Sequence, residues 1–184
     1  MKKESVFKYI TRLTLTLLLI SATVAALLAV VNRVTEPIIV QANVKKTQNA
    51  IQIVLPGGYE EELTGYTDTS GIVSKVYKGA NGYAIEVTPA GFDSTITMMV
   101  GVDFAGKVLG ISVISHTESA GLGAVVASST SAGETFRNQF VGQFGSVLVS
   151  KDGGTIDAIT NATITSRAIC DGINAALDCV AALG

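Results

Sequence analysis

The chain has 184 residues, of which 48% are hydrophobic and 15% are charged, and its formal net charge is -2. A weakly acidic chain with no tryptophan and no basic stripe is not expected to bind nucleic acid. HExxH, CxxC and GxSxG are absent, and neither GxGxxG nor GxxxxGK opens a predicted helix. We therefore expect no metal site, no dinucleotide or P-loop phosphate site, and no catalytic site built from side chains alone.

Residues 13–33 are predicted to form a single transmembrane helix. Residues 13–31 hold no charge, and a helix of that length spans about 28 Å, close to the hydrocarbon thickness of a bilayer. A cleaved signal peptide is the alternative, since a basic start followed by an apolar run fits one too. The run is longer than a usual signal core, however, and Asn32 and Arg33 follow it where small residues would mark a cleavage site. We therefore expect a retained anchor.

The charges beside this span predict its orientation. Residues 1–12 hold four basic residues and one acid, and three basic residues lie soon after the apolar run. Long domains translocate largely regardless of their charge, so the short tail should dominate. We therefore predict a cytoplasmic tail over residues 1–12 and an extracytoplasmic domain over residues 34–184, in a single-pass protein of the cell membrane.

Pro37 is expected to separate the span from a second helix, because proline fits an α-helix only in its first turn. This amphipathic helix is predicted over residues 37–54, and Pro56-Gly57-Gly58 ends it. Its predicted apolar side consists of Ile39, Ala42, Ala50, Ile51 and Val54.

Four strands are predicted after this helix. Residues 79–82 and 103–106 have the composition of hairpin turns, and the stretches on either side are rich in β-branched residues. The predicted strands are 72–78, 83–88, 96–102 and 107–114. They indicate an antiparallel sheet of four or more strands.

The last third of the chain is predicted to be mostly helical. Ser131-Ala132-Gly133-Glu134 resembles a capping box that opens a short helix, with Phe136 and Phe140 on one side. Residues 147–149 are compatible with one more short strand. The spacing of apolar residues predicts a terminal helix from about Thr165 to Leu183, packed on the sheet. Strands followed by helices indicate an α+β domain.

Both cysteines of the chain, Cys170 and Cys179, fall in this terminal helix. Nine positions of helix separate them by about 13 Å along the axis, which exceeds the reach of a disulfide. We expect both to be buried free thiols.

Two loops are candidates for a ligand site. Residues 116–123, His-Thr-Glu-Ser-Ala-Gly-Leu-Gly, follow a predicted strand, and their two glycines let the backbone approach a ligand, although such loops more often serve turns. Residues 157–166 lead into the terminal helix and contain four hydroxyl residues and an asparagine. A helix start favours a phosphate, but on pattern alone an N-cap with spare hydroxyls is the favoured explanation of this loop.

The second loop resembles the flavinylation motif, Asp-x-x-Ser/Thr-Gly-Ala-Thr, of bacterial FMN-bearing membrane subunits. Asp157, Thr160, Ala162 and Thr163 match it, and Asn161 replaces its glycine. In that family a flavin transferase joins the FMN phosphate to the hydroxyl of the last threonine, which aligns with Thr163. Asparagine tolerates the left-handed region, so it can replace a glycine that serves a positive φ. If the glycine instead makes room for the flavin or the transferase, the Asn161 side chain would interfere with the modification; we favour the first account.

The resemblance covers nearly the whole chain, including the single N-terminal span. The loop at 116–123 is similar to the family's His-x-Glu-Thr-Pro-Gly-Leu-Gly, with serine and alanine in place of Thr and Pro. Gly82-Tyr83, residues 99–103 and Phe136-Arg137-x-Gln139-Phe140 also resemble the family. The similarity is greatest to the G subunit of the Rnf-type ion-translocating oxidoreductase complex; the C subunit of the sodium-pumping NADH:quinone reductase is related but typically longer.

This resemblance implies an electron-carrying subunit with FMN bound covalently, by a phosphoester, to Thr163. The implied partners are the membrane, a flavin transferase and the other subunits of a complex that moves electrons between ferredoxin and NAD⁺ while it pumps Na⁺ or H⁺. The other residues implied to lie at the flavin are Thr160, Asn161, Ala162, Thr165, His116, Glu118, Gly121, Leu122 and Gly123.

Some roles stay open on the sequence. Glu118 either hydrogen-bonds an edge of the flavin or caps its loop, and His116 either serves the flavin or is structural. An FMN domain of another extracytoplasmic reductase, or of a sodium-translocating NADH:quinone reductase, is the alternative function, and a tethered binding domain without a cofactor is the third.

Overall fold

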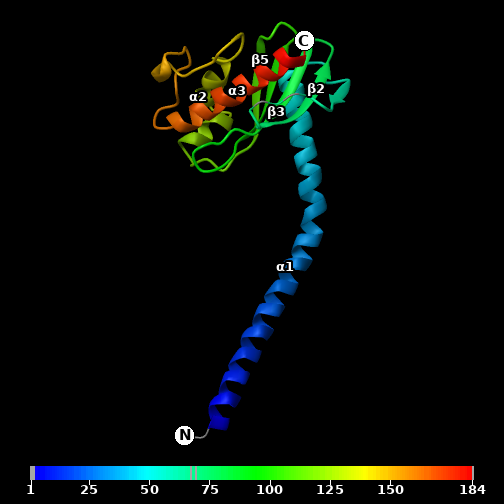
Figure 1. Ribbon diagram of the computed structural model, residues 1–184, viewed down its shortest axis with the longest axis vertical. Helices are drawn as coiled ribbons and strands as arrows, with labels where there is room; N and C mark the ends of the chain where they lie inside the picture. The colour runs from blue at the N-terminus through cyan, green and yellow to red at the C-terminus, as the bar shows by residue number, and fades with distance from the viewer. Residues whose placement is uncertain (1–2, 67, 69, 184) are drawn as a thin grey trace. The chain divides into compact units, whose positions relative to one another are not determined.

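The computed structural model describes residues 3–66, 68 and 70–183, in two compact units, residues 1–45 and 46–184. From Lys3 onward the first unit belongs to helix α1, Lys3–Val54 (Figure 1). The stretch Phe7–Val54 is long and apolar enough to cross a membrane, with a mean hydropathy of 2.5 in its most apolar window and no buried residue there. This helix fits a single-pass membrane protein.

The predicted helix break at Pro37 is wrong, because α1 continues through this residue. Proline removes one backbone donor and costs about 3 kcal/mol inside a helix, but regular helix on both sides holds the chain in place. Proline has no N–H to donate to the carbonyl four residues earlier. The side chains around Pro37 are exposed, so that carbonyl is open to donors outside the helix. Ile39 and Ala42 are exposed as well, whereas Ala50, Ile51 and Val54 are buried as predicted.

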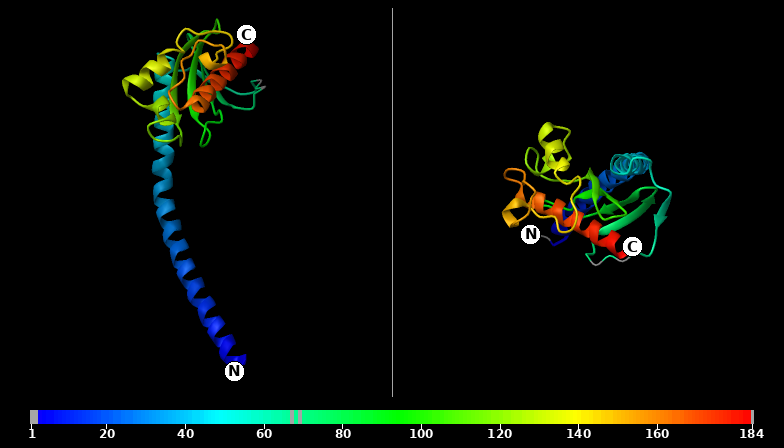
Figure 2. Two further views of the ribbon diagram at one scale, coloured as in Figure 1. Left: turned by 90° about the vertical axis from the view of Figure 1, so that its left-hand side faces the viewer. Right: turned by 90° about the horizontal axis from the view of Figure 1, so that it is seen from above.

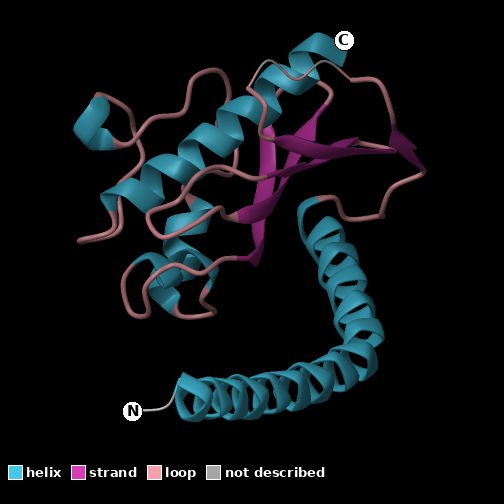
Figure 3. Cartoon of the chain, turned by 60° about the horizontal axis from the view of Figure 1, so that its bottom comes forward, coloured by secondary structure: helices cyan, strands magenta, loops and turns pink. Residues whose placement is uncertain are grey.

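The second unit is built on a five-stranded antiparallel sheet in which each strand pairs with the next along the chain (Figure 3). The four predicted strands are confirmed to within one residue at each end, and a three-residue strand before them was not predicted. The strands are β1 (Glu61–Leu63), β2 (Val73–Gly79), β3 (Gly82–Val87), β4 (Thr97–Asp103) and β5 (Val108–Ser115). β1 is too short to show any alternation of apolar and polar residues, and for that reason the sequence does not reveal it.

The sheet is covered on both faces, by α3 (Thr163–Leu183) on one and by residues 50–55 on the other (Figure 2, left). Successive residues of a strand point to opposite faces. On β3, Ile85 therefore joins the cluster under α3, while Ala84 joins the cluster under residues 50–55. Both clusters are closed to solvent, and the fold is the α+β domain with packed helices that the sequence predicts.

Shorter elements lie between β5 and α3: η1 (Gly123–Ala127), α2 (Ser131–Asn138) and η2 (Ser150–Asp152). The predicted capping box is shifted by one residue, since Thr130 is the N-cap and its hydroxyl accepts from the Gly133 amide at 3.4 Å. Phe136 and Phe140 are both buried, with their ring centroids 5.2 Å apart.

The short strand predicted at residues 147–149 does not form; only an isolated parallel bridge joins Val149 to Ile156. The cause is a side chain of α3. Asn174 Oδ1 accepts from the Val147 amide (2.8 Å) and Asn174 Nδ2 donates to the Val147 carbonyl (2.9 Å), so an amide side chain takes the place of a neighbouring strand.

Candidate functional site

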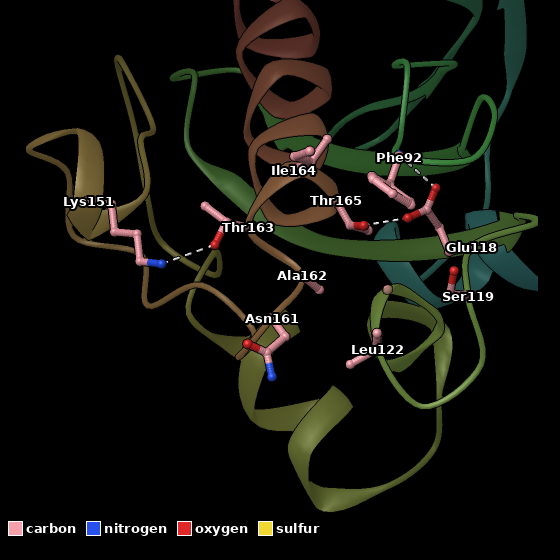
Figure 4. Close-up of a pocket in the computed structure, with 11 residues that line it drawn as sticks. Phe92, Glu118, Ser119, Leu122, Lys151, Asn161, Ala162, Thr163, Ile164 and Thr165 are labelled. Atoms are coloured by element: carbon pink, nitrogen blue, oxygen red, sulfur yellow. Dashed lines mark hydrogen bonds between the residues drawn. The ribbon is translucent and has the colours of Figure 1, made fainter.

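A cavity of about 330 Å³ lies at the N-terminal end of α3 (Figure 4). Its volume is at the lower end of the range of about 300 to 1,000 Å³ that small-molecule sites occupy. Segments far apart in the sequence meet there: the loop before β4, the loop after β5, η2, and the start of α3. The lining residues are Phe92, Glu118, Ser119, Leu122, Gly123, Lys151, Asn161, Ala162, Thr163, Ile164 and Thr165.

Most of the predicted site residues meet at this cavity. Those that line it are Glu118, Leu122, Gly123, Asn161, Ala162, Thr163 and Thr165. Thr160, Gly121 and His116 do not line it. Ser119 and Ile164 were not predicted, although each lies beside a predicted residue. Phe92 and Lys151 were not predicted either, and no local pattern in the sequence marks them.

A tight turn presents the start of α3 to the cavity. The Ala162 amide donates to the Ile159 carbonyl (3.0 Å), and Asn161, the third residue of the turn, has φ 61°. Asn161 is the only non-glycine residue with positive φ among the described residues, so Thr160 before it has negative φ. A positive φ at this position alone defines a type II turn, which takes glycine or asparagine there. The conformation explains why asparagine occupies the position of the motif's glycine.

Ser166 fixes this turn against the helix. Its buried hydroxyl donates to the Ala162 carbonyl (2.9 Å) and accepts from the Ile159 amide (3.1 Å). The Ser166 amide donates to the same Ala162 carbonyl (2.9 Å) and is an early helical bond of α3. α3 begins at Thr163, two residues before the predicted start, so the first three amides of the helix have no partner within it. These amides and the helix dipole favour an anion at this end of the cavity.

The three threonines of the loop lie in different surroundings. Thr160 is exposed on the turn and outside the cavity lining. Thr165 is buried, 1% exposed, and its hydroxyl donates to the Glu118 carboxylate. Thr163 is half-buried, and its hydroxyl accepts a hydrogen bond from Lys151 Nζ at 3.2 Å (Figure 4). Thr163 therefore lies in the cavity wall, and among the described residues its hydroxyl accepts a hydrogen bond but donates none.

Lys151 reaches Thr163 because η2 is docked on α3. Asp152, the next residue, accepts two hydrogen bonds from the Arg167 guanidinium, Nε to Oδ2 and Nη2 to Oδ1, both at 2.7 Å. The hydrogen bonds from Arg167 hold the pKa of the Asp152 carboxyl below its ordinary value. Both partners keep their charges at neutral pH, so the pair fixes η2 in position.

Glu118 joins the opposite wall of the cavity to α3. Its carboxylate is buried, 6% exposed, and accepts from the Phe92 amide (2.9 Å), the Asp93 amide (3.2 Å) and the Thr165 hydroxyl. A Cβ on Gly123 would lie 2.5 Å from Glu118 Oε2 and 2.7 Å from Thr165 Oγ1, so a larger residue would displace these two side chains from their contact. The close approach that the Gly-Leu-Gly sequence permits is therefore used by Glu118 and Thr165. These hydrogen bonds tie Glu118 to its surroundings within the protein, and its contact with an edge of the flavin stays a prediction.

His116 and Gly121 shape the same loop from outside the cavity. His116 Nδ1 accepts from the Glu118 amide at 3.2 Å, which places a structural contact on this side chain. Gly121 has φ 75°, in the left-handed region, with open space where a side chain would lie. It is required for its backbone conformation, whereas Gly123 is required for its missing Cβ.

The fold and the cavity together define a class of protein: an α+β domain behind a long apolar helix, whose cavity presents a threonine hydroxyl in contact with a lysine, together with the unpaired amides of a helix start, beside an apolar wall. Such a site suits a phosphate-bearing cofactor more than hydrolysis by side chains. The FMN-binding domain family matches residues 91–178, a range that includes every residue of the cavity lining.

Relatives are similar over nearly their whole length. The G subunit of the ion-translocating oxidoreductase complex of Methanosarcina acetivorans is 32% identical over 187 residues, covering 95% of this chain and 96% of the relative. The protein of the same name from Yersinia pestis is 35% identical, and the match covers 89% of this chain and 87% of the relative. The G subunit of the Na(+)-translocating ferredoxin:NAD(+) oxidoreductase complex of Acetobacterium woodii is 32% identical, and the match covers 91% of this chain and 90% of the relative. The chain belongs to this family, the G subunits of ion-translocating oxidoreductase complexes, and contains an FMN-binding domain.

Proposed function

We propose that the chain is an electron-carrying subunit of a membrane-bound ferredoxin:NAD⁺ oxidoreductase complex that translocates Na⁺ or H⁺, with FMN attached by a phosphoester to Thr163. The name of the Acetobacterium woodii relative supports the electron partners, and the family supports the association with further subunits. The observation that carries the covalent link is the Thr163 hydroxyl in the cavity wall, 3.2 Å from Lys151 Nζ. When bound, the flavin supplies the redox chemistry, and the protein supplies attachment and orientation.

The residues of the cavity fit FMN at both of its ends. Lys151 and the unpaired amides at the start of α3 are donors of the kind that bind a phosphate. On the other side, Phe92, Leu122 and Ile164 offer apolar surface, and their exposed fractions are 65%, 41% and 50%. Large apolar side chains left open at the rim of a cavity suit a flat aromatic ring that covers them.

The chain's own residues have distinct tasks in this proposal. Thr163 forms the ester, and the turn at Asn161 presents it at the first position of α3. Glu118 holds the loop that carries Phe92 against Thr165 of the helix, so that the two walls of the cavity keep their spacing. The chain would reach its membrane partners through the N-terminal anchor, with residues 34–184 on the extracytoplasmic side, where a covalent link prevents loss of the cofactor.

The proposal is tested by producing the protein together with a flavin transferase, denaturing it, and recording flavin fluorescence on a gel. We expect a fluorescent band for the native chain and for Thr160→Ala, and none for Thr163→Ala. Tandem mass spectrometry of the tryptic peptide 152–167 then assigns the modified hydroxyl, since this peptide holds Thr160, Thr163 and Thr165. Fluorescence that persists in Thr163→Ala, or that is absent from the native chain, would contradict the covalent link.

A further inference from the structure

We propose that Lys151 binds the phosphate of the phosphoester on Thr163, and that the Asp152–Arg167 ion pair positions it. This inference rests on the proposed function and assigns a residue that neither the motif nor the family resemblance identifies. Lys151 would act twice on the same group, first while the ester forms and then as the charge partner of the finished phosphoester.

In the structure Lys151 already contacts the hydroxyl to which the phosphate would be attached. Its Nζ lies 3.2 Å from Thr163 Oγ1, the atom that bonds to phosphorus in the ester. An ammonium group has three donors, and Thr163 uses one of them. The unesterified oxygens of a phosphate on Oγ1 lie next to that oxygen, so they come within reach of the remaining donors.

The charge of Lys151 is available for this purpose. Among residues 3–66, 68 and 70–183, the one ion pair joins Arg167 to Asp152. The acid next to Lys151 is therefore already neutralised, and Lys151 lines the cavity with an unpaired positive charge. A phosphate esterified on both sides carries one negative charge, which Lys151 balances.

Two side-chain contacts between η2 and α3 set the position of Lys151. Thr163 and Arg167 are four residues apart and lie on the same side of the helix, one turn from each other. The neighbouring residues Lys151 and Asp152 contact one of them each. η2 is itself closed by backbone hydrogen bonds, including Ser150 N–H to the Ile156 carbonyl at 2.7 Å. Asp152 and Arg167 are thus positioning residues for Lys151.

In the attachment step, a flavin adenine dinucleotide held by the transferase serves as the donor. Thr163 Oγ attacks the phosphorus on the FMN side, an O–P bond forms, and the bond from that phosphorus to the AMP oxygen breaks. AMP leaves, and the hydroxyl proton passes to a base of the transferase. Lys151 stabilises the negative charge on the phosphoryl oxygens during this transfer, as preorganised donors do in other group transfers.

The test uses the full-length, flavin-free protein in detergent, with purified transferase and flavin adenine dinucleotide. We compare the native chain with Lys151→Met, Lys151→Arg and Asp152→Asn. Lys78→Met is the matched control, because Lys78 is exposed on β2 and outside the cavity lining. The measured quantities are kcat and KM for the acceptor protein, obtained from covalent flavin on denaturing gels.

We expect kcat to fall about tenfold in Lys151→Met, because a hydrogen bond to a charged group is lost. Lys151→Arg should retain most of the rate, Asp152→Asn should fall about threefold, and Lys78→Met should equal the native chain. An unchanged kcat in Lys151→Met overturns the proposal. A raised KM with unchanged kcat also overturns it, since Lys151 would then serve transferase docking.

A second measurement probes the finished phosphoester and does not depend on the rate of loading. In fully flavinylated protein, the ³¹P resonance should move in Lys151→Met and stay in place in Lys78→Met. If the ³¹P chemical shift is the same in the native chain, Lys151→Met and Lys78→Met, then Lys151 does not contact the phosphate. If the native chain carries no flavin on Thr163, the proposed function fails; if it carries flavin there and Lys151→Met behaves identically, only this inference fails.

Discussion

At the scale of single residues, Asn161 decides how Thr163 is presented. Its φ of 61° and the hydrogen bond from Ala162 to Ile159 define a turn that few residue types accept. Left-handed backbone costs most residues about 1 to 2 kcal/mol, and glycine and asparagine least. Asparagine is thus a conformational equivalent of the glycine in the flavinylation motif, and its side chain is exposed at the rim of the cavity.

Exchanging Asn161 tests this interpretation. Asn161→Gly should leave the free energy of unfolding within about 0.5 kcal/mol of the native value, whereas Asn161→Ala should lower it by about 1 kcal/mol, because alanine is strained at this φ. Urea denaturation of the flavin-free protein measures both. Equal stability of the alanine and glycine variants would mean that the turn changes conformation freely and that φ does not select the residue.

Glu118 provides the second prediction at this scale. Glu118→Ala removes the acceptor for two backbone amides and the Thr165 hydroxyl, so we expect the free energy of unfolding to fall by about 3 kcal/mol. Glu60→Ala is the control, since Glu60 is exposed and its substitution should change stability by less than about 0.5 kcal/mol. Urea midpoints compare the two; a small effect at Glu118 would show that water accepts from the three donors in place of the carboxylate without cost.

The site residues that sequence alone identifies are those that follow one another along the chain. Thr163, Ala162 and Asn161 belong to one loop, and Leu122 and Gly123 to another, so their spacing carries the resemblance. Lys151 lies in neither motif, and its approach to Thr163 depends on the ion pair between Asp152 and Arg167. Phe92 likewise reaches the cavity only because its amide is bound by Glu118, 26 positions later. Contacts of this kind arise in the folded chain and have no local pattern.

At the scale of elements, the predictions that succeeded are those that depend on neighbouring residues in the sequence. The hairpins β2–β3 and β4–β5 were predictable because glycine-containing turns separate runs of β-branched residues. The apolar stretch at residues 147–149 failed as a strand because Asn174 of α3 satisfies its backbone, a contact 27 residues away. Length and turn chemistry are local properties, whereas the partner of a short extended segment is not.

The face of the sheet under residues 50–55 gives a matched pair of tests. Gly101 and Gly110 are register partners on β4 and β5. A Cβ on Gly101 would lie 2.3 Å from the Val54 carbonyl oxygen, while a Cβ on Gly110 would lie 3.9 Å from Val54 Cα. Gly101→Ala should therefore destabilise by about 2 kcal/mol or more through overpacking against backbone, and Gly110→Ala should be neutral or slightly stabilising. Thermal and urea melts that rank the two variants the other way would contradict this packing.

The cysteines of α3 yield a prediction about pH. Both Cys170 and Cys179 are buried free thiols, as the sequence predicts. Burial raises the pKa of Cys170 to about 12 and also raises the pKa of Cys179. A raised pKa means that the fold favours the neutral thiol, so this contribution to stability is complete below the ordinary thiol pKa and is lost as the pH rises toward 12. At pH 8 a disulfide reagent such as DTNB should react with neither thiol in the native protein and with both in urea; rapid reaction of the native protein would show that α3 opens.

At the scale of the whole molecule, the boundary between the two units predicts which fragment folds. Residues 46–184 contain every member of both core clusters, including Ile51, Val54 and Leu55. This fragment should be soluble and should melt cooperatively. A shorter fragment, residues 58–184, leaves Tyr77, Ala84 and Met99 uncovered, and we expect it to aggregate or to melt at least about 10 °C lower, since about 2 kcal/mol or more of burial is lost. Equal melting temperatures would mean that residues 50–55 do not stabilise the domain.

The orientation of the chain across the membrane is the last property to test, and the buried thiols make the test direct. Because Cys170 and Cys179 are inaccessible, a single introduced cysteine reports its own location without removal of the native ones. Asn81→Cys lies on the exposed turn between β2 and β3, and Ser5→Cys lies in the basic tail. A membrane-impermeant maleimide applied to spheroplasts should label Asn81→Cys at once, and Ser5→Cys only after permeabilisation, because the basic tail favours the cytoplasm. The native chain is the blank. The reverse pattern would place the FMN-binding domain in the cytoplasm, and the rationale for a covalently retained cofactor would then have to come from something other than loss to the exterior.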